Sequence, residues 1–315
     1  DGTGDLQRLA FSNGLRPIDV ILPGNLGGTD ADEIGLLSRN PAVVEIIDSR
    51  SGEQLLSINL DKNFEPIAAT AGMAGASPVV AVLLKHHERA LLRVEEFDAL
   101  TGDSLRTIPY NPTWEPLDVV GIGQGAGRRY GVLHANPEPD KLSRLEIRDI
   151  HGTRTANVAL GAKMVPQQAL VYTDGDERVA VLRRNGDPTR QDIAIVDPDA
   201  GAVIQTLAFN PQYTSSDFVH TPDIDANLAA QFSAAGRHDS DGKVKVETRD
   251  LASGYVLHNV FLTPEQPIQD IVYLGEASGA TTPSLGLLIR TRRDFAIVMV
   301  DLLTGEKTGN LEFQF

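Results

Sequence analysis

The chain has 315 residues, 41% of them hydrophobic and 23% charged, which is the composition of an ordinary globular protein and excludes a largely disordered chain. No apolar run approaches the length of a transmembrane helix, so we expect no membrane insertion. The net charge of -15 argues against a nucleic-acid partner, and the absence of cysteine excludes disulfides, thiolate nucleophiles and cysteine-ligated zinc.

The chain opens with an Asp-Gly turn and an apolar strand within residues 1–16. This segment contains no methionine, basic region or apolar signal stretch, so we expect the chain to be part of a longer polypeptide.

Four strands are predicted next. The apolar strand IDVIL (18–22) is followed by a loop rich in Gly and Asp and by a second apolar strand, EIGLLSR (33–39). An alternating strand, VVEIID (43–48), leads through the turn DSRSG into an outer strand, EQLLSINL (53–60). The same order of strands and turns then recurs to the end of the chain.

The turn before each outer strand reads Asp, two or three variable residues, then Gly, at a spacing near fifty residues. Its copies are Asp48–Gly52, Asp98–Gly102, Asp149–Gly152, Asp197–Gly201, Asp250–Gly254 and Asp301–Gly305. We interpret each copy as a hairpin corner, in which the Asp carboxylate accepts hydrogen bonds from turn amides and Gly adopts a positive φ. Six acids at equivalent places in a repeat indicate a structural role rather than catalysis.

About fifteen residues after each Asp, a large apolar or aromatic residue stands two positions before a proline. The examples are Phe64 with Pro66, Trp114 with Pro116, Met164 with Pro166, Tyr213 without the proline, and Pro267 without the aromatic residue. Because large aromatic residues dominate protein cores, we expect Trp114, the only tryptophan, to pack between neighbouring units rather than to stack on a ligand.

Short strands at regular spacing, with no helical periodicity between them, predict an all-β chain without βαβ units. Six four-stranded units predict a β-propeller that forms a single domain over residues 1–315. The expected blades are about 17–65, 66–115, 116–165, 166–214, 215–266 and 267–315, with 1–16 as an extra outer strand. Because the chain also ends in its own outer strand, GNLEFQF, seven blades are the alternative to six.

The loop between the first two strands, LPGNLGGTDADEIGLL at 22–37, resembles the FG-GAP and VCBS repeats of integrin-type propellers and bacterial surface proteins. The resemblance implies calcium ligands at Asn25, Gly27, Thr29 and Asp32. Since only one of these is a carboxylate and Ca²⁺ prefers six or more oxygens, we expect a solvated loop instead. The paired acids Asp223 with Asp225 and Asp239 with Asp241 lack supporting ligands in the same way. No cofactor or metal is therefore expected.

No catalytic constellation is found. The histidines at 86, 87, 134, 151, 220, 238 and 258 show no zincin spacing, and GIGQGAG (121–127) is not followed by the helix of a dinucleotide site. The acids Glu45, Glu95, Glu96 and Glu146 occupy alternating strand positions that we expect to face solvent.

These observations favour a non-enzymatic extracellular or cell-surface module of a larger bacterial protein, which binds a protein or surface glycan through loops at one rim and acts in adhesion or assembly. The alternative is a carbohydrate-binding or carbohydrate-active propeller that uses the central cleft, although aromatic residues make up only 5% of the chain. An intracellular scaffold of the WD-repeat type is the third hypothesis, and the chain lacks the Trp-Asp and Gly-His signatures of that class.

Overall fold

The computed structural model describes residues 12, 14–24, 26, 33–49, 51–136, 138, 142–185, 191–221, 230–238, 240–262, 268–276, 283–290 and 295–313. In these residues the regular structure is β-strand, apart from one short 3-10 turn at Gly125–Gly127. The prediction of an all-β chain is therefore confirmed. Over the same residues, no helix reaches the length and apolarity that a bilayer crossing requires.

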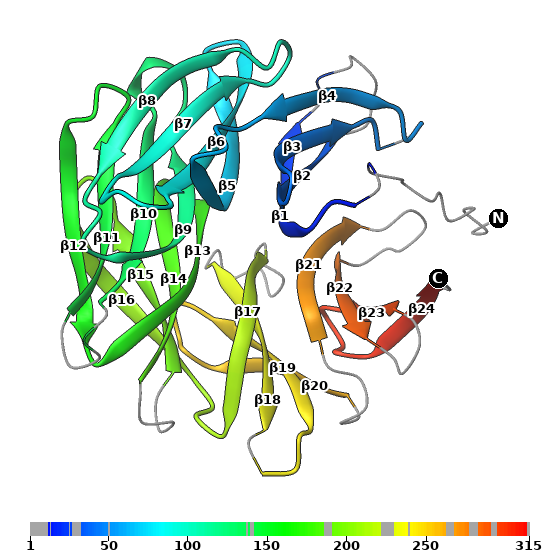
Figure 1. Cartoon of the computed structure of the whole chain (residues 1–315). Helices are drawn as coiled ribbons and strands as arrows, with labels where there is room; N and C mark the ends of the chain where they lie inside the picture. Colours follow the sequence, from blue (N-terminus) through cyan, green and yellow to red (C-terminus); the bar gives the residue numbers. More distant parts are fainter. Residues whose placement is uncertain are drawn as a thin grey trace. The chain divides into compact units, whose positions relative to one another are not determined.

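The strands form six four-stranded antiparallel sheets, each with its strands in chain order (Figure 1). The first three sheets are β1 (Pro17–Gly24), β2 (Glu33–Arg39), β3 (Ala42–Ile47), β4 (Gln54–Asn59); β5 (Phe64–Ala74), β6 (Ser77–His86), β7 (Leu92–Asp98), β8 (Ser104–Tyr110); β9 (Glu115–Ile122), β10 (Arg129–Ala135), β11 (Leu142–Asp149), β12 (Arg154–Ala162). The others are β13 (Met164–Asp174), β14 (Asp176–Asn185), β15 (Gln191–Asp197), β16 (Ala202–Phe209); β17 (Tyr213–Thr221), β18 (Gln231–His238), β19 (Val244–Asp250), β20 (Val256–Leu262); β21 (Ile268–Glu276), β22 (Pro283–Arg290), β23 (Phe295–Asp301), β24 (Lys307–Phe313).

This succession of four-stranded sheets is that of propeller blades, and the fold is a six-bladed β-propeller. Six blades, rather than seven, agrees with the favoured prediction. The extra strand expected within residues 1–16 falls almost wholly outside the described residues. The residues divide into two compact units, one of residues up to 171 with 197–202 and one of residues 172–196 with 203 onward, and each unit is described by itself below.

The hairpin interpretation of the Asp-Gly turns is confirmed in all six copies. Asp98 shows the pattern: its Oδ1 accepts from the amides of Leu100 at 2.8 Å and Thr101 at 2.9 Å, while its carbonyl accepts from the Gly102 amide at 2.9 Å. The six turn glycines have φ between 64° and 84°. Each turn joins the third strand of a sheet to the fourth, as the sequence indicates.

The second and third strands are buried on both faces. Nearly every residue of β6 is buried, whereas β8 alternates between exposed and buried positions. Neighbouring sheets cover these faces: Leu37 and Val44 of the first sheet pack with Val80 and Val82 of the second. In the other unit, Val246 and Leu287 belong to one core cluster shared by the last two sheets. Burial on both faces explains why the middle strands appear in the sequence as continuous apolar runs.

The left-handed turn conformation predicts a specific cost for Gly254→Ala. A Cβ at Gly254 would meet no atom within 4 Å, so the substitution tests the φ of 71° alone. We expect a loss of about 1–2 kcal/mol in the free energy of unfolding, measured by urea denaturation. The control Gly127→Ala also has open space and lacks a positive φ, so it should stay within about 0.5 kcal/mol of wild type. Equal effects of the two variants would contradict the hairpin assignment.

Candidate functional site

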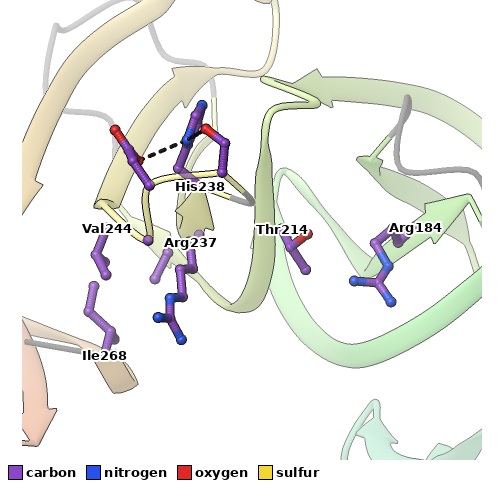
Figure 2. A pocket seen from close by; sticks show the side chains of 11 residues that line it. Arg184, Thr214, Arg237, His238, Val244 and Ile268 are labelled. Carbon is purple, nitrogen blue, oxygen red and sulfur yellow. Dashed lines mark hydrogen bonds and ion pairs between the residues drawn. The ribbon is translucent and has the colours of Figure 1, made fainter. Parts of the chain in front are cut away.

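A cavity of about 760 Å³ opens in the unit that contains β17–β24. Its walls come from three successive sheets: Arg184 from β14, Thr214 from β17, residues 235–238 from β18, Val244 from β19 and Ile268 from β21. The hairpin between β18 and β19 contributes Ser240, Asp241 and Gly242 (Figure 2). Cavities of this size hold small molecules or short peptide segments.

Two arginines give the cavity its charge. Arg183 and Arg184 are consecutive on β14, so their side chains point to opposite faces of the sheet. The guanidinium of Arg183 is buried against Asp192, with 2.5 Å between Nε and Oδ1, whereas Arg184 faces the cavity. Arg237 lies opposite Thr214 on one side and Val244 on the other. Within the described residues, neither Arg184 nor Arg237 forms an ion pair or a side-chain hydrogen bond.

The β18–β19 hairpin holds one wall of the cavity in place. His238 Nδ1 lies 2.9 Å from Asp241 Oδ1, and the His238 ring packs on Tyr213 with 5.0 Å between centroids. The same Asp241 carboxylate pairs with Lys243 at 2.9 Å. The pKa of Asp241 is lowered, first by its hydrogen bonds with Lys243, so this acid is ionised and its charge is matched by Lys243 of its own hairpin.

Carboxylates on the first strands of several sheets are a second polar feature, which recurs in both compact units. Asp19, Asp118 and Asp217 each follow a register shift in β1, β9 and β17, respectively. One oxygen of each accepts from the next amide in its own strand at 2.8 Å. The other oxygen accepts from the first strand of another sheet, at 2.8 Å from Ala69, 2.8 Å from Ala169 and 2.9 Å from Ile271, respectively.

The environment of Asp118 and Asp217 opposes ionisation. Burial and the neighbouring Asp19 charge raise the pKa of Asp118 to about 7, although hydrogen bonds from Ala169 and Val119 act in the opposite direction. Burial, followed by the hydrogen bond and charge of Asp270, raises the pKa of Asp217. Asp19 and Asp118 also line a cavity of about 430 Å³ in their own unit. Because their oxygens accept hydrogen bonds from backbone amides of the sheets, we assign a structural role to these carboxylates.

The acids expected to face solvent are mostly buried, and that expectation was wrong. Glu45, Glu96 and Glu146 are 4%, 0% and 2% exposed. An acid flanked by apolar residues on a strand faces solvent only where one side of the sheet is open, and here the middle strands are covered on both sides. Glu95 is also largely covered and pairs with Arg93 at 2.7 Å.

Glu96 shows how the negative charge of such a buried acid is balanced. It accepts from Arg128 Nε at 2.8 Å and from the Tyr130 hydroxyl at 2.6 Å, and Arg106 lies 3.1 Å away. Burial alone would raise the pKa of Glu96, but the hydrogen bonds from Arg128 and Tyr130 and the arginine charges outweigh it, and the pKa is lowered. This carboxylate is therefore an ionised structural group.

The histidines are placed separately. Within the described residues, no group of three or more His, Asp or Glu side chains is arranged to hold a metal ion. His134 is fully buried, and burial with the nearby Arg144 and Arg148 charges lowers its pKa to about 4. His220 stacks on Tyr172 with 4.9 Å between centroids, and burial lowers its pKa. The calcium ligands implied at Asn25, Gly27, Thr29 and Asp32 lie outside the described residues, as do Asp223, Asp225 and Asp239.

Trp114 lies just before β9, and the Arg144 guanidinium of β11 covers one face of its indole ring at 3.8 Å from the centroid. Phe64 belongs to the core between the first two sheets, as expected for this position of the repeat, and carries Arg93 over its ring at 3.8 Å. The residues of GIGQGAG lead through the 3-10 turn directly into β10, as a strand connection should.

The sequence argument missed Arg184 and Arg237. The repeat offers a signal for Arg184, because RVAVLRR places two arginines at the end of an apolar strand, where only one of them can be buried. For Arg237 the available signal is Gly242, whose φ of 70° allows a tight hairpin against the guanidinium. Only the fold shows that the two arginines line the same cavity.

Comparisons with known proteins support the architecture. No protein-family model matches the chain, and no curated protein matches its sequence. Among solved structures, hydrazine synthase of Kuenenia stuttgartiensis is similar with a TM-score of 0.60 and 11% identity, covering 98% of this chain and 90% of that one. An apocarotenoid oxygenase of Synechocystis gives 0.57 and 12%, covering 94% and 71%. BBS1N, solved in complex with ARL6DN, gives 0.58 and 13%, covering 91% and 78%. At such identities the likeness shows the fold alone.

The raised pKa of Asp118 predicts a pH dependence of stability. The folded state disfavours the ionised form of Asp118. Its contribution to folding stability is therefore fully present below the unfolded pKa and is lost as the pH rises to about 7. Relative to Asp118→Asn, wild type should lose more than about 1 kcal/mol of unfolding free energy between pH 4 and 7. Asp103→Asn, at an exposed position, should show no such trend. Parallel curves for wild type and Asp118→Asn in urea titrations would contradict the assignment.

His134 predicts the opposite slope. The folded state disfavours its charged form, so wild type should lose stability relative to His134→Gln as pH falls from about 6.5 to about 4. The exposed His151, changed to Gln, provides the control. Histidine NMR titration supplies a direct readout, and a normal titration of His134 in the folded protein would refute the prediction.

Proposed function

We propose that this chain is a non-enzymatic binding module, extracellular or at the cell surface, that acts in adhesion or assembly within a larger bacterial protein. The observation that carries the proposal is the cavity at β14, β17, β18 and β21, which is built on strands of three sheets and contains arginines with no ion pair among the described residues. A scaffold of packed sheets with polar groups at a hairpin end is suited to recognition, because binding does not require the loop to be ordered first.

Several buried charged side chains elsewhere in the described part of the chain have structural roles. Glu96 and Asp192 are paired with arginines, and Asp118 and Asp217 hold strand amides. The acidic, cysteine-free composition supports an exported protein that remains dispersed through charge repulsion. Assignment of the repeat to the FG-GAP and VCBS type is part of this proposal and is supported by the sequence of the loop at 22–37 and by the period near fifty residues.

A protein partner is favoured over a glycan. Sugar-binding sites commonly offer an aromatic face, and the described residues of the cavity lining include no Trp, Tyr or Phe. Trp114, the only tryptophan, is covered on one face by Arg144. The carbohydrate alternative is therefore the one to be excluded by experiment.

Binding to cells of the organism that encodes the chain tests the proposal. Fluorescently labelled chain should bind intact cells saturably, with displacement by unlabelled chain. Protease treatment of the cells should abolish the signal, and glycosidase treatment should leave it. A signal that only glycosidase removes would favour the carbohydrate alternative, and no saturable signal would overturn the binding-module proposal. Antibody staining of unpermeabilised cells tests the location, and protection of the parent protein from antibody would contradict it.

A further inference from the structure

Among the described lining residues of the cavity between β14, β18 and β21, two arginines face a single acid, whereas the chain as a whole has 28 Lys and Arg against 43 Asp and Glu. That acid, Asp241, is already paired with Lys243 and also contacts His238. The charges of Arg184 and Arg237 are therefore not cancelled by the described acids of the lining.

The two guanidinium groups lie on either side of Thr214 and extend in the same direction (Figure 2). A Cβ at Gly242 would lie 3.1 Å from Nη2 of Arg237, so glycine at this position leaves room for the guanidinium beside the hairpin. Arginine presents parallel N–H donors that match the geometry of a carboxylate.

Aliphatic side chains form part of the lining beside the arginines. Ala235, Val244 and Ile268 stand beside the arginines, and the described lining has no aromatic ring other than the His238 imidazole. Figure 2 places Val244 and Ile268 on the far side of Arg237 from Arg184. A ligand that fits must therefore present an anion next to an aliphatic group, a combination typical of a peptide. A polyphosphate such as nucleic acid would be repelled by the overall charge of -15.

We propose that this cavity binds an acidic peptide segment of a partner protein. A carboxylate, from an Asp or Glu side chain or from a chain terminus, pairs with Arg184 and Arg237, and a neighbouring aliphatic side chain packs on Val244 and Ile268. The proposal rests on the proposed function and specifies the chemistry of the partner. Because the ligand lies across strands of three sheets, its recognition depends on the fold of this unit rather than on one loop.

Selection from a random octapeptide library displayed on phage, with the purified full chain as target, tests the proposal. Selected sequences should be enriched in Asp or Glu adjacent to Leu, Ile or Val. The best peptide is then synthesised with a fluorescein label, with free and amidated C-termini, and with Asn or Gln in place of its acids. Loss of binding on amidation identifies the terminal carboxylate, and loss on acid replacement identifies a side chain.

Variants locate the site. Arg184→Gln and Arg237→Gln should each weaken peptide binding about tenfold or more by fluorescence polarisation, and Arg237→Lys should give an intermediate loss, because it keeps the charge but not the paired donors. Arg154→Gln removes the same charge from an exposed position on β12 and should change the Kd less than about twofold. Matching melting curves for all four variants show that the fold is intact.

Three results would overturn the inference: selected peptides without acids, binding unaffected by either Gln variant, or binding of polygalacturonate at these arginines with no peptide binding. Failure here is distinguishable from failure of the proposed function. If wild type and the Arg184→Gln, Arg237→Gln double variant bind cells equally well, the binding-module proposal stands and the peptide site is wrong. If wild type does not bind cells at all, the proposed function itself fails.

Discussion

Burial of both faces of each four-stranded sheet is the constraint on which the rest of this structure depends. A sheet covered on one side needs an alternating pattern, but the middle strands here need apolar residues at successive positions, as in β6. The fourth strands whose burial is described keep an open side and alternating exposure, as β8 shows. The charged residues of the middle strands must then be matched by charge inside the protein.

That requirement explains the polar network between the second and third sheets. Glu96 satisfies Arg128 and Tyr130, and Tyr110 donates to the Tyr130 carbonyl at 2.6 Å, so several polar groups are satisfied together away from water. Burial of an ionised carboxylate without such donors would cost roughly several kcal/mol, so the group would take up a proton instead. The arginines at the cavity differ from this pattern, which is what sets the cavity apart from the interior polar groups.

The architecture could be predicted from sequence because its signals are local. An Asp carboxylate reaches the amides of its own turn, so six Asp-Gly copies reveal six hairpins and, with their flanking strands, six blades. Other features depend on which strands become neighbours. Glu45 and Glu146 have the sequence context of solvent-facing acids and yet are buried, and Arg184 and Arg237 are 53 positions apart in the chain. Their shared cavity is set by sheet packing, which no local pattern encodes.

The carboxylates at the start of the first strands join sheets that share no backbone ladder. Asp19 reaches the Ala69 amide, and Asp118 reaches the Ala169 amide. The second sheet has Ala68 at the matching position, and there the Thr70 hydroxyl accepts from the Gly121 amide at 3.3 Å instead. Different side chains can thus make the hydrogen bond that joins the first strands of two sheets. Duplicated units can therefore diverge far in sequence while each copy still contacts its neighbour at the same position along the first strand.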